Sequence, residues 1–358
     1  KRLQDATGVK AVTIHRLLEY GFSGTVASGS FQRNAENPLQ ADMVVIDEAS
    51  MLDVPLAYHL LRAIAPGTTL VLVGDADQLP SVGPGTALRD IIQSGCVPVI
   101  ELTTVFRQAQ RSMIVVNAHR INQGQEPIYN SFEKDFYIVE EAEPAVMSSR
   151  VGELVTERLP RYLGCSRQDI QVLSPVRRGP AGVDHLNIIL QKALNPRAQD
   201  LPLSGVARVL PADRVMQIRN NYDKGVFNGD IGLVLAVNET GEVLVEYPDR
   251  EEGSQVEYEQ DERNELSLAY AMSVHKSQGS EFPVVVMLVP RVMPALMTRN
   301  LLYTAVTRAR RFVVLVGEKR TVALYVRNNK AMHRFGLLAD RLVREKCLSC
   351  DDGSFAVT

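Results

Sequence analysis

Short runs of β-branched apolar residues alternate along this chain with longer stretches in which apolar residues recur at helical spacing. The apolar runs occupy residues 43–46, 70–73, 97–102, 170–173, 284–289 and 312–316. Continuous runs of this length are typical of parallel strands buried on both faces, and residues 55–64 and 183–194 have the pattern of helices that cover such strands. The chain is therefore predicted to be an α/β protein with parallel sheets.

The pattern changes between residues 215 and 266, where short alternating strands are separated by turn signals. Residues 231–237 and 242–247 are predicted to pair as a hairpin. We predict a small β-barrel inserted into the second of two α/β domains. The predicted boundaries are 1–103 for the first domain, with a loop or small hairpin within 20–40, 104–214 and 267–345 for the second, 215–266 for the insertion and 346–358 for a tail.

Composition narrows the class of protein. The 358 residues, of which 45% are hydrophobic, suffice for two domain cores. No apolar run approaches the roughly 20 residues that cross a bilayer, and the first residues do not resemble a secretory signal, so a cytoplasmic protein without a membrane span is expected. Four cysteines are too few for a disulfide framework, and Cys347 and Cys350 supply only half of a zinc-site spacing. A net charge of −3 excludes nucleic-acid binding over the whole surface but permits a local basic groove.

Acidic and amide side chains follow the first two apolar runs. Asp47 and Glu48 come directly after residues 43–46, and Gln78 lies in the Gly74–Pro80 segment that follows 70–73. In a nucleotide hydrolase the first carboxylate holds Mg²⁺, the second orients and deprotonates the attacking water, and a glutamine contacts the terminal phosphate. Taken singly, each segment could equally be a polar turn or a helix cap. Their shared position at strand ends, where α/β sheets bind ligands, favours phosphate chemistry.

Two arginines stand in segments outside the first predicted domain, Arg107 and Arg308. A lone arginine is most often a surface residue, but an arginine supplied across a cleft can stabilise the charge that builds up in phosphoryl transfer. Farther along, Gly279 would allow backbone to approach a phosphate, and Glu281 could accept a hydrogen bond from a ribose hydroxyl. A plain loop would explain the last two residues equally well.

Together these segments resemble a known family. Six of them match, in order, helicase motifs Ia, II, III, IV, V and VI of RecD-like superfamily 1 enzymes. They are Thr13-Ile-His-Arg-Leu-Leu18, Val45-Ile-Asp-Glu-Ala-Ser50, Gly74-Asp-Ala-Asp-Gln-Leu-Pro80, Val105-Phe-Arg-Gln108, Val274-His-Lys-Ser-Gln-Gly-Ser-Glu281 and Tyr303-Thr-Ala-Val-Thr-Arg-Ala-Arg310. Further matches are Ser174-Pro175 with Gly179, Gly182 and Asn187, and the stretch from Asn220 to Asp230.

The resemblance implies two RecA-like parallel-sheet P-loop NTPase domains and ATP-driven 5′-to-3′ movement on single-stranded DNA, in DNA recombination, DNA repair or conjugative transfer. ATP and Mg²⁺ would be the cofactors. Asp47 would bind Mg²⁺, Glu48 would act as the base, Gln78, Arg107 and Arg308 would contact the γ-phosphate, and Gly279 and Glu281 would lie at the nucleotide. The residues implied along the DNA are Thr13, His15, Asn220, His275 and Lys276. Implied partners are single-stranded DNA, duplex junctions and, in some family settings, recombination nucleases or relaxases.

One departure from the family concerns the phosphate-binding loop. No Gly-x-x-x-x-Gly-Lys-Ser/Thr segment occurs in these 358 residues, although the family carries one ahead of the first matched motif. Without that loop the phosphates lack their main cradle, so these residues alone are expected to hydrolyse ATP poorly. The alternative is a non-catalytic DNA-binding or assembly subunit that keeps the helicase fold. A nuclease is not favoured, because no carboxylate cluster beside a lysine is recognisable outside the ATP motifs.

Overall fold

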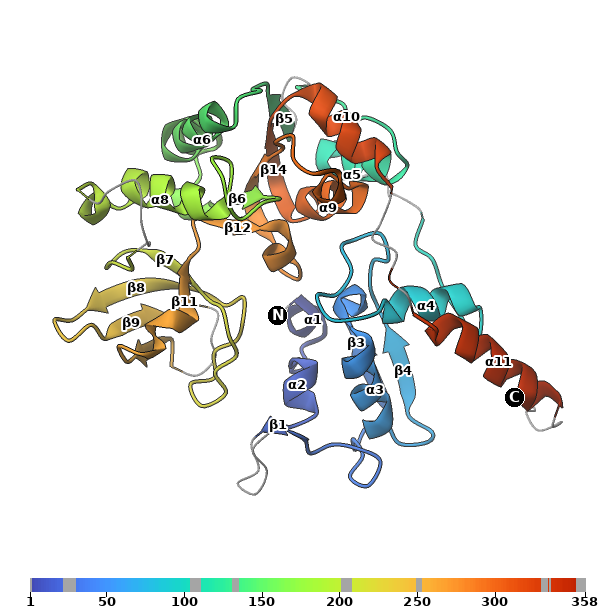
Figure 1. Cartoon of the computed structure of the whole chain (residues 1–358). Helices are drawn as coiled ribbons and strands as arrows, with labels where there is room; N and C mark the ends of the chain where they lie inside the picture. Colours follow the sequence, from blue (N-terminus) through green and yellow to red (C-terminus); the bar gives the residue numbers. More distant parts are fainter. Residues whose placement is uncertain are drawn as a thin grey trace. The chain divides into compact units, whose positions relative to one another are not determined.

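The computed structural model describes residues 2–21, 30–103, 111–130, 135–200, 208–248, 253–329, 334 and 336–351 (Figure 1). The chain divides into two compact units, of which unit 1 comprises residues 1–104 and 332–358, and unit 2 comprises residues 105–331. Unit 1 is thus completed by the C-terminal end of the chain. No helix in the described part is both long and apolar enough to cross a membrane.

Unit 1 is built around a parallel pair of strands. Strands β3 (Met43–Ile46) and β4 (Thr69–Leu72) are in register from Met43 opposite Thr69 to Ile46 opposite Leu72. The other elements are α1 (Arg2–Thr7), α2 (Ile14–Leu17), β1 (Tyr20–Gly21), β2 (Ser30–Phe31), η1 (Ala49–Met51), α3 (Val54–Ala63), α4 (Ala87–Ser94) and α11 (Leu338–Asp351). Strands β1 and β2 pair antiparallel, which agrees with the small hairpin predicted within residues 20–40. Helix α11 runs through Asp351, so it continues past the boundary predicted between residues 345 and 346.

Two expectations about unit 1 were wrong. Alternate side chains of its parallel strands are exposed, including Met43, Val45 and Val71, so these strands bury one face rather than two. Residues 97–102 form no strand, and Ile100 and Leu102 are 88% and 94% exposed. A strand needs a neighbour to receive its backbone hydrogen bonds, and within the described residues β3 and β4 pair only with each other.

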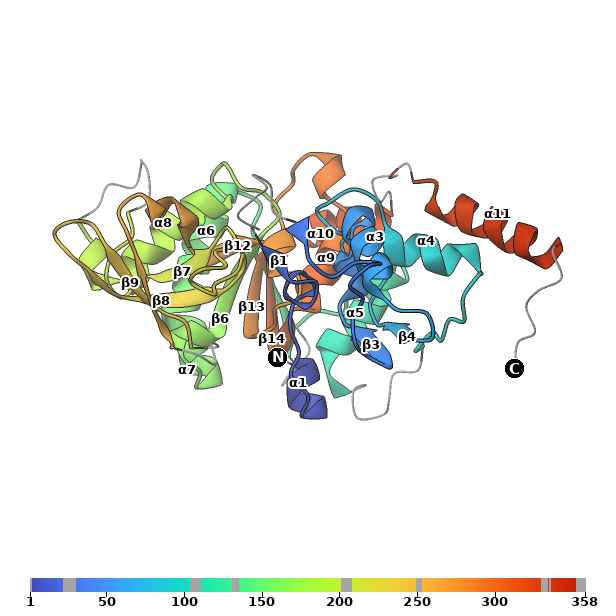
Figure 2. The same ribbon diagram turned by 90° about the horizontal axis from the view of Figure 1, so that it is seen from below.

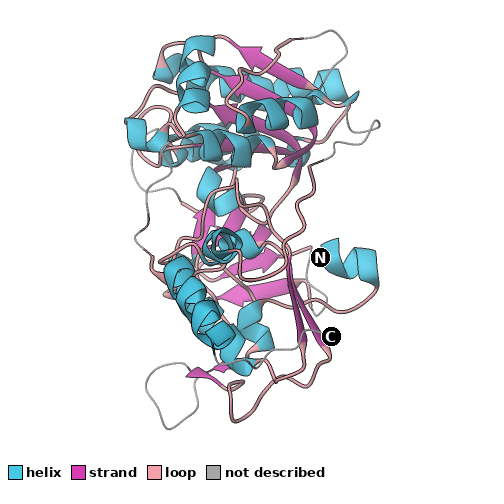
Figure 3. Cartoon of the chain, turned by 90° about the vertical axis from the view of Figure 1, so that its right-hand side faces the viewer, coloured by secondary structure: helices cyan, strands magenta, loops and turns pink. Residues whose placement is uncertain are grey.

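Unit 2 contains the parallel sheet that the apolar runs predicted. Its strands lie in the order β12-β6-β13-β14-β5, all parallel. Helices α6 and α8 pack on one face and α5, α9 and α10 on the other (Figure 1). The strands lie among helices in Figure 3 as well. The strands are β5 (Phe136–Val139), β6 (Ile170–Ser174), β12 (Ala271–Ser273), β13 (Phe282–Leu288) and β14 (Ala309–Val316). The helices are α5 (Met113–Asn122), α6 (Pro144–Glu153), η3 (Leu154–Arg158), α7 (Leu159–Leu163), η4 (Arg167–Asp169), α8 (Val183–Leu194), η5 (Pro196–Ala198), η7 (Val274–Ser277), η8 (Pro294–Leu296), α9 (Arg299–Val306) and α10 (Lys319–Arg327).

An antiparallel sheet is inserted into the sequence of unit 2 between η5 and β12, and has the order β10-β9-β8-β7-β11. Its strands β7, β8 and β9 lie on the left in Figure 2. Its elements are β7 (Arg214–Gln217), β8 (Ile231–Val237), β9 (Val243–Glu246), β10 (Gln255–Tyr258), η6 (Glu262–Glu265) and β11 (Leu266–Leu268). The predicted hairpin is confirmed, because β8 and β9 pair antiparallel from Leu233 opposite Glu246 to Val237 opposite Val243. The fold is therefore α/β with parallel sheets and an inserted antiparallel β sheet.

The two connections between the sheets of unit 2 meet at a buried carboxylate. Asp213 precedes β7, and Tyr270 lies between β11 and β12. The Tyr270 hydroxyl donates to Asp213 Oδ1 at 3.0 Å, and Asn195 Nδ2 donates to the same oxygen at 2.7 Å. Burial raises the pKa of Asp213, although its hydrogen bonds act in the opposite direction. This polar cluster fastens the inserted sheet to the parallel one.

Candidate nucleotide and DNA sites

The acidic pair lies where β3 ends. Asp47 is exposed and its Oδ1 accepts the Glu48 backbone N–H at 2.8 Å. Glu48 has a left-handed backbone with φ of 51°, which costs a non-glycine residue about 1–2 kcal/mol. The Val73 N–H donates to Ile46 O, and the Ala49 N–H donates to Val73 O, each at 2.8 Å. The turn that carries both carboxylates is therefore fixed to the end of β4.

Gly74 makes the approach of the second segment possible. A Cβ atom there would lie 2.9 Å from both the Ser50 backbone nitrogen and Leu88 Cδ2, so no larger residue fits without movement. Asp75 then forms a turn, with its Oδ1 accepting the Asp77 N–H at 3.0 Å. The Gln78 amide donates to Asp75 Oδ2 at 3.3 Å, and Gln78 is 8% exposed. Gln78 thus lies at the same sheet edge as Asp47, largely buried and held by a carboxylate.

These residues suit a magnesium ion that is completed by phosphate. Mg²⁺ is usually bound by one or two carboxylates together with phosphate oxygens and water, so one exposed aspartate at a strand end fits that role. Among the described residues, no group of three His, Cys, Asp or Glu side chains could enclose a metal ion by itself. The donor set of Asp47 beside Glu48 therefore fits a nucleotide-borne Mg²⁺ and not a closed structural metal site.

Arg308 joins two of the predicted motifs inside unit 2. It is 3% exposed, and its guanidinium donates to Thr304 O and to Ser280 O, each at 3.2 Å. Its own carbonyl accepts the Phe282 N–H at 2.8 Å. The side chain is therefore oriented by the end of α9 and the segment that leads into β13.

Gly279 and Glu281 flank the Ser280 carbonyl that Arg308 contacts. Gly279 is exposed with φ of 72°, a conformation that favours glycine. Glu281 Oε2 accepts a hydrogen bond from Arg310 Nε at 2.8 Å. The expected ribose-binding carboxylate is thus already paired with an arginine, and sequence reasoning missed that partner because it depends on the alignment of β13 with β14.

The structure groups the predicted nucleotide residues by unit. It brings Asp47, Glu48 and Gln78 together within unit 1, and Gly279, Glu281 and Arg308 together within unit 2. Arg107 lies outside the described residues.

In unit 1, the two residues expected along DNA have structural roles of their own. Thr13 is exposed and caps α2, with its hydroxyl accepting the Arg16 N–H at 3.4 Å. His15 packs against Tyr20 and Phe31, with ring centroids 5.7 Å from each. Burial lowers the pKa of His15, and Asp53 partly offsets this effect. The imidazole therefore supports the base of the β1–β2 hairpin.

In unit 2, basic side chains gather where two neighbouring strands end. His275 and Lys276 are exposed just after β12, which pairs with β6. Arg177, in the loop after β6, has a side chain that is 82% exposed and pairs with Asp184 at 3.3 Å. The pKa of Lys276 is lowered first by partial desolvation of its ammonium group and then by the nearby Arg177, while Asp184 acts in the opposite direction. Sequence reasoning noted Arg177 only as part of a charge cluster, because its closeness to Lys276 depends on the strand order.

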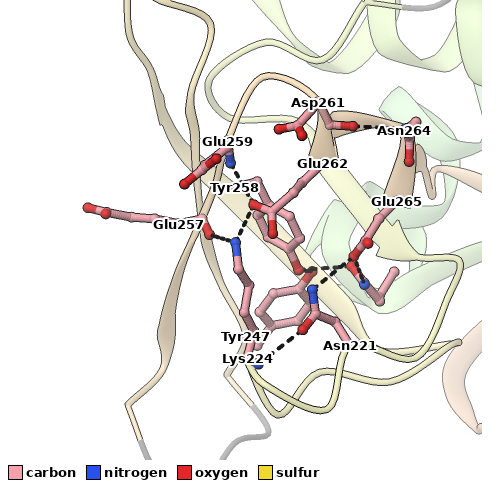
Figure 4. Close-up of polar contacts among 11 residues, drawn as sticks. Asn221, Lys224, Tyr247, Glu257, Tyr258, Glu259, Asp261, Glu262, Asn264 and Glu265 are labelled. Carbon is pink, nitrogen blue, oxygen red and sulfur yellow. Dashed lines mark hydrogen bonds and ion pairs between the residues drawn. The ribbon is translucent and has the colours of Figure 1, made fainter. Parts of the chain in front are cut away.

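Asn220 belongs to an exposed loop of the inserted sheet. Its Nδ2 donates to the Tyr222 hydroxyl at 3.2 Å, and its Oδ1 accepts the Asn228 N–H at 3.0 Å. The loop is also fixed by Lys224, whose ammonium pairs with Glu262 and donates to Glu257 O at 2.6 Å (Figure 4). The hydrogen bond from Lys224 is the main cause that lowers the pKa of Glu262.

A buried chain of side-chain hydrogen bonds lies beneath this loop (Figure 4). The hydroxyls of Tyr247 and Tyr258 lie 2.7 Å apart, and Tyr258 donates to Gln217 Oε1 at 2.8 Å. Glu265 then accepts from Gln217 Nε2 at 2.9 Å and from Asn221 Nδ2 at 3.3 Å. Asn220 is thus presented on a loop whose two ends are braced.

Three family models match the chain in order. They are an AAA domain over residues 1–142, an ATP-dependent RecD-like DNA helicase SH3 domain over 186–247 and a UvrD-like helicase C-terminal domain over 268–316. A crystal structure of Pif1 helicase from Bacteroides in complex with ADP-AlF3 and ssDNA is similar at a TM-score of 0.46 and 16% identity, over 96% of this chain and 84% of that one.

Curated relatives match most of this chain. The ATP-dependent RecD2 DNA helicase of Deinococcus radiodurans is 38% identical over 311 residues, which cover 87% of this chain and 40% of the relative. The RecBCD enzyme subunit RecD of Mycolicibacterium smegmatis is 32% identical over 326 residues, which cover 88% of this chain and 56% of the relative. The chain thus spans about half the length of these relatives. The ordered family matches and these identities show that the chain belongs to the RecD-like family of DNA helicases.

Proposed function

We propose that this chain forms most of the motor of an ATP-dependent DNA helicase that moves 5′-to-3′ along single-stranded DNA. The observation that carries this proposal is the placement of Asp47, Glu48 and Gln78 at the ends of two neighbouring parallel strands. The names of two relatives, an ATP-dependent RecD2 DNA helicase and a RecBCD enzyme subunit, support an ATP-dependent motor that can work alongside other subunits. We place it in recombination or repair, with recombination nucleases as partners. Conjugative transfer with a relaxase is the other setting that suits such a motor.

We assign the nucleotide chemistry as follows. Asp47 would hold Mg²⁺, which when bound would supply positive charge at the phosphates, and Glu48 would accept the proton of the attacking water. Gln78 contacts the γ-phosphate, and Arg107 and Arg308 stabilise the charge that develops on it. Gly279 and Glu281 contribute to nucleotide binding. Hydrogen bonds from Arg308 to two backbone carbonyls orient it before the nucleotide binds, which reduces reorganisation during the reaction.

We assign the DNA strand to six polar and basic residues, all of which are exposed except the half-buried His15. They are Thr13, His15, Asn220, Arg177, His275 and Lys276. Contacts from such side chains to phosphates do not depend on base sequence. They weaken as the salt concentration rises, because the release of counterions from DNA then becomes less favourable. The modest net charge of −3 agrees with a local groove of this kind.

Arg308→Ala in the full-length protein tests the motor function. We expect single-stranded-DNA-stimulated ATP turnover to fall by about 10³-fold or more, because an arginine at the transferred phosphate contributes on that order. The dissociation constant for single-stranded DNA should change by no more than about threefold, since phosphate contacts elsewhere dominate binding. Turnover and fluorescence anisotropy would measure the two effects.

Two further variants make this result interpretable. Arg311→Ala, at an exposed position of β14, the strand that Arg308 directly precedes, is the matched control and should retain turnover. Arg308→Lys keeps the charge but cannot contact both carbonyls, so it should remain folded by thermal melting and still be slow. Normal turnover by folded Arg308→Ala would exclude the catalytic role. Absence of DNA-stimulated turnover in the wild-type full-length protein would favour a non-catalytic DNA-binding or assembly subunit.

A further inference from the structure

The C-terminal end of the chain contacts the loop that follows Gln78. Arg334 Nη1 donates to Gly85 O at 2.8 Å, to Ser81 Oγ at 3.2 Å and to Gly83 O, and its Nη2 donates to Ser81 O. All four acceptors are neutral, and three of them are backbone carbonyls. Hydrogen bonds from a charged donor are about twice as strong as neutral ones, so one guanidinium organises the whole loop.

The loop packs closely against the start of α3. A Cβ atom on Gly83 would lie 1.9 Å from Asp53 Oδ2, and one on Gly85, which has φ of +84°, would lie 2.3 Å from Val54 Cγ2. The Val54 N–H donates to Pro84 O at 3.0 Å. The loop therefore covers the start of α3 with its carbonyls of residues 81, 83 and 85 gathered around Arg334.

A second arginine holds the other side of the same segment. Arg89, on α4, donates from Nη2 to Ala76 O at 2.7 Å. Gln78 thus lies between Ala76, which Arg89 contacts, and Ser81, which Arg334 contacts. The two contacts fix the backbone on both sides of the residue that we assign to the γ-phosphate.

The rest of the C-terminal segment keeps Arg334 in place. Helix α11 lies beside α4 in both views (Figures 1 and 2). Leu338, at the start of α11, packs against the core of unit 1. A Cβ atom on Gly336 would lie 3.2 Å from Asp90 Oδ2, which shows how closely the segment approaches α4.

We propose that Arg334 is a positioning residue for ATP hydrolysis, which acts by holding the loop of residues 81–85 so that Gln78 stays where it can contact the γ-phosphate. This inference rests on the proposed function. In this proposal the C-terminal segment contributes to ATP hydrolysis, because Arg334, which holds the loop after Gln78, lies about 250 residues after that loop in the sequence.

The test compares Arg334→Ala with Arg341→Ala, an exposed arginine on α11, in the full-length protein. Arg334→Ala should lower kcat of DNA-stimulated ATP hydrolysis by about 10- to 100-fold, since small misplacements of a catalytic group have effects of that order. KM for ATP and the dissociation constant for single-stranded DNA should change less than about threefold, because substrate binding does not use the loop in this proposal. Hydrogen exchange of residues 79–86 should become faster, and Arg341→Ala should match wild type throughout.

A double-mutant cycle with Gln78→Ala decides whether the effect passes through Gln78. In the Gln78→Ala background, Arg334→Ala should cause no further loss of kcat, because the two residues act as one unit. Fully additive losses, or faster exchange in residues 79–86 with unchanged kcat, would overturn the proposal. Unchanged exchange would overturn it independently of turnover. Lack of wild-type turnover would instead count against the proposed function.

Discussion

Gly182 shows what a single residue decides in the loop that carries Arg177. Its φ of −84° is open to any residue, so backbone conformation does not require glycine there. The lack of space does require glycine, because a Cβ atom at this position would lie 2.5 Å from the Arg178 carbonyl carbon and 2.6 Å from Arg177 O. Both contacts are with backbone, which cannot rotate away as the end of a side chain can.

Gly182→Ala is therefore expected to lower the free energy of unfolding by about 1–3 kcal/mol, the usual cost of overpacking. The loop should shift, so affinity for single-stranded DNA should also fall. The control is Gly152→Ala in α6, where the new Cβ would meet only Ile189 Cγ2 at 3.9 Å. That change should leave stability unchanged or raise it by about 0.5–1 kcal/mol, because alanine favours a helix interior. Urea unfolding and fluorescence anisotropy measure both effects, and equal stability of the two variants would contradict the argument.

At the scale of elements, the proposed DNA surface of unit 2 arises from two strands that end side by side. β6 leads into the loop with Arg177, and β12 leads into η7 with Lys276. Parallel neighbours end at the same sheet edge, so side chains about 100 residues apart in sequence come close enough for Arg177 to lower the pKa of Lys276. These two cations are the ones that we propose to contact the phosphate backbone of DNA.

Arg177→Ala and Lys276→Ala should each weaken single-stranded DNA binding and reduce the salt dependence. If each residue contacts one phosphate, the slope of log K against log salt concentration should become less steep by about 0.7 per residue. Arg150→Ala, on α6 and paired with Glu153, is a control that should leave the slope unchanged. Titrations at several salt concentrations provide the slopes. Identical slopes for all three variants and wild type would show that these residues do not contact phosphates.

At the scale of the whole molecule, the chain is organised as two units, and unit 2 in turn joins two sheets. The carboxylate of Asp213 accepts hydrogen bonds from Asn195, Gln191, Tyr270 and the Leu210 backbone. These donors come from α8, from the entry into β7 and from the return to β12. The Asp213 carboxylate therefore links both chain segments that run between the two sheets. Removing any one donor would leave a buried carboxylate with fewer hydrogen bonds.

Tyr270→Phe should lower the free energy of unfolding by about 1–3 kcal/mol, the cost of an unsatisfied buried group. The effect should depend on pH. The pKa of Asp213 is higher in the folded protein than its ordinary value of 3.8, so the folded state loses stability as pH rises above that value and the carboxyl group ionises. The hydrogen bond from the Tyr270 hydroxyl stabilises the ionised form and so reduces this loss. The loss in Tyr270→Phe should therefore be larger at pH 7 than at pH 4 in urea unfolding. Tyr162→Phe, at an exposed position, is the control. Equal losses of unfolding free energy in the two variants would show that the Asp213 cluster does not stabilise the junction between the sheets.

Local pattern alone determined much of the architecture. The apolar runs predicted β3, β4, β6, β13 and β14, and the helical spacing predicted α3 and α8, because strand and helix periods are properties of neighbouring residues. Alternation and turn residues likewise predicted the β8–β9 hairpin. The polar residues at strand ends were predicted for the same reason, since a strand that ends in a buried sheet exposes its following residues to a ligand.

Tertiary structure decided what depends on residues far apart in the chain. Residues 97–102 have a strand pattern but no strand partner among the described residues, and pairing, not pattern, makes a strand. The hydrogen bonds between Glu281 and Arg310 and between Arg334 and the loop after Gln78 join positions 29 and about 250 residues apart. The effect of Arg177 on the pKa of Lys276 follows from the order of the strands. Sequence names the side chains available at each element's end, but only the order of strands and the return path of the chain determine which of them meet.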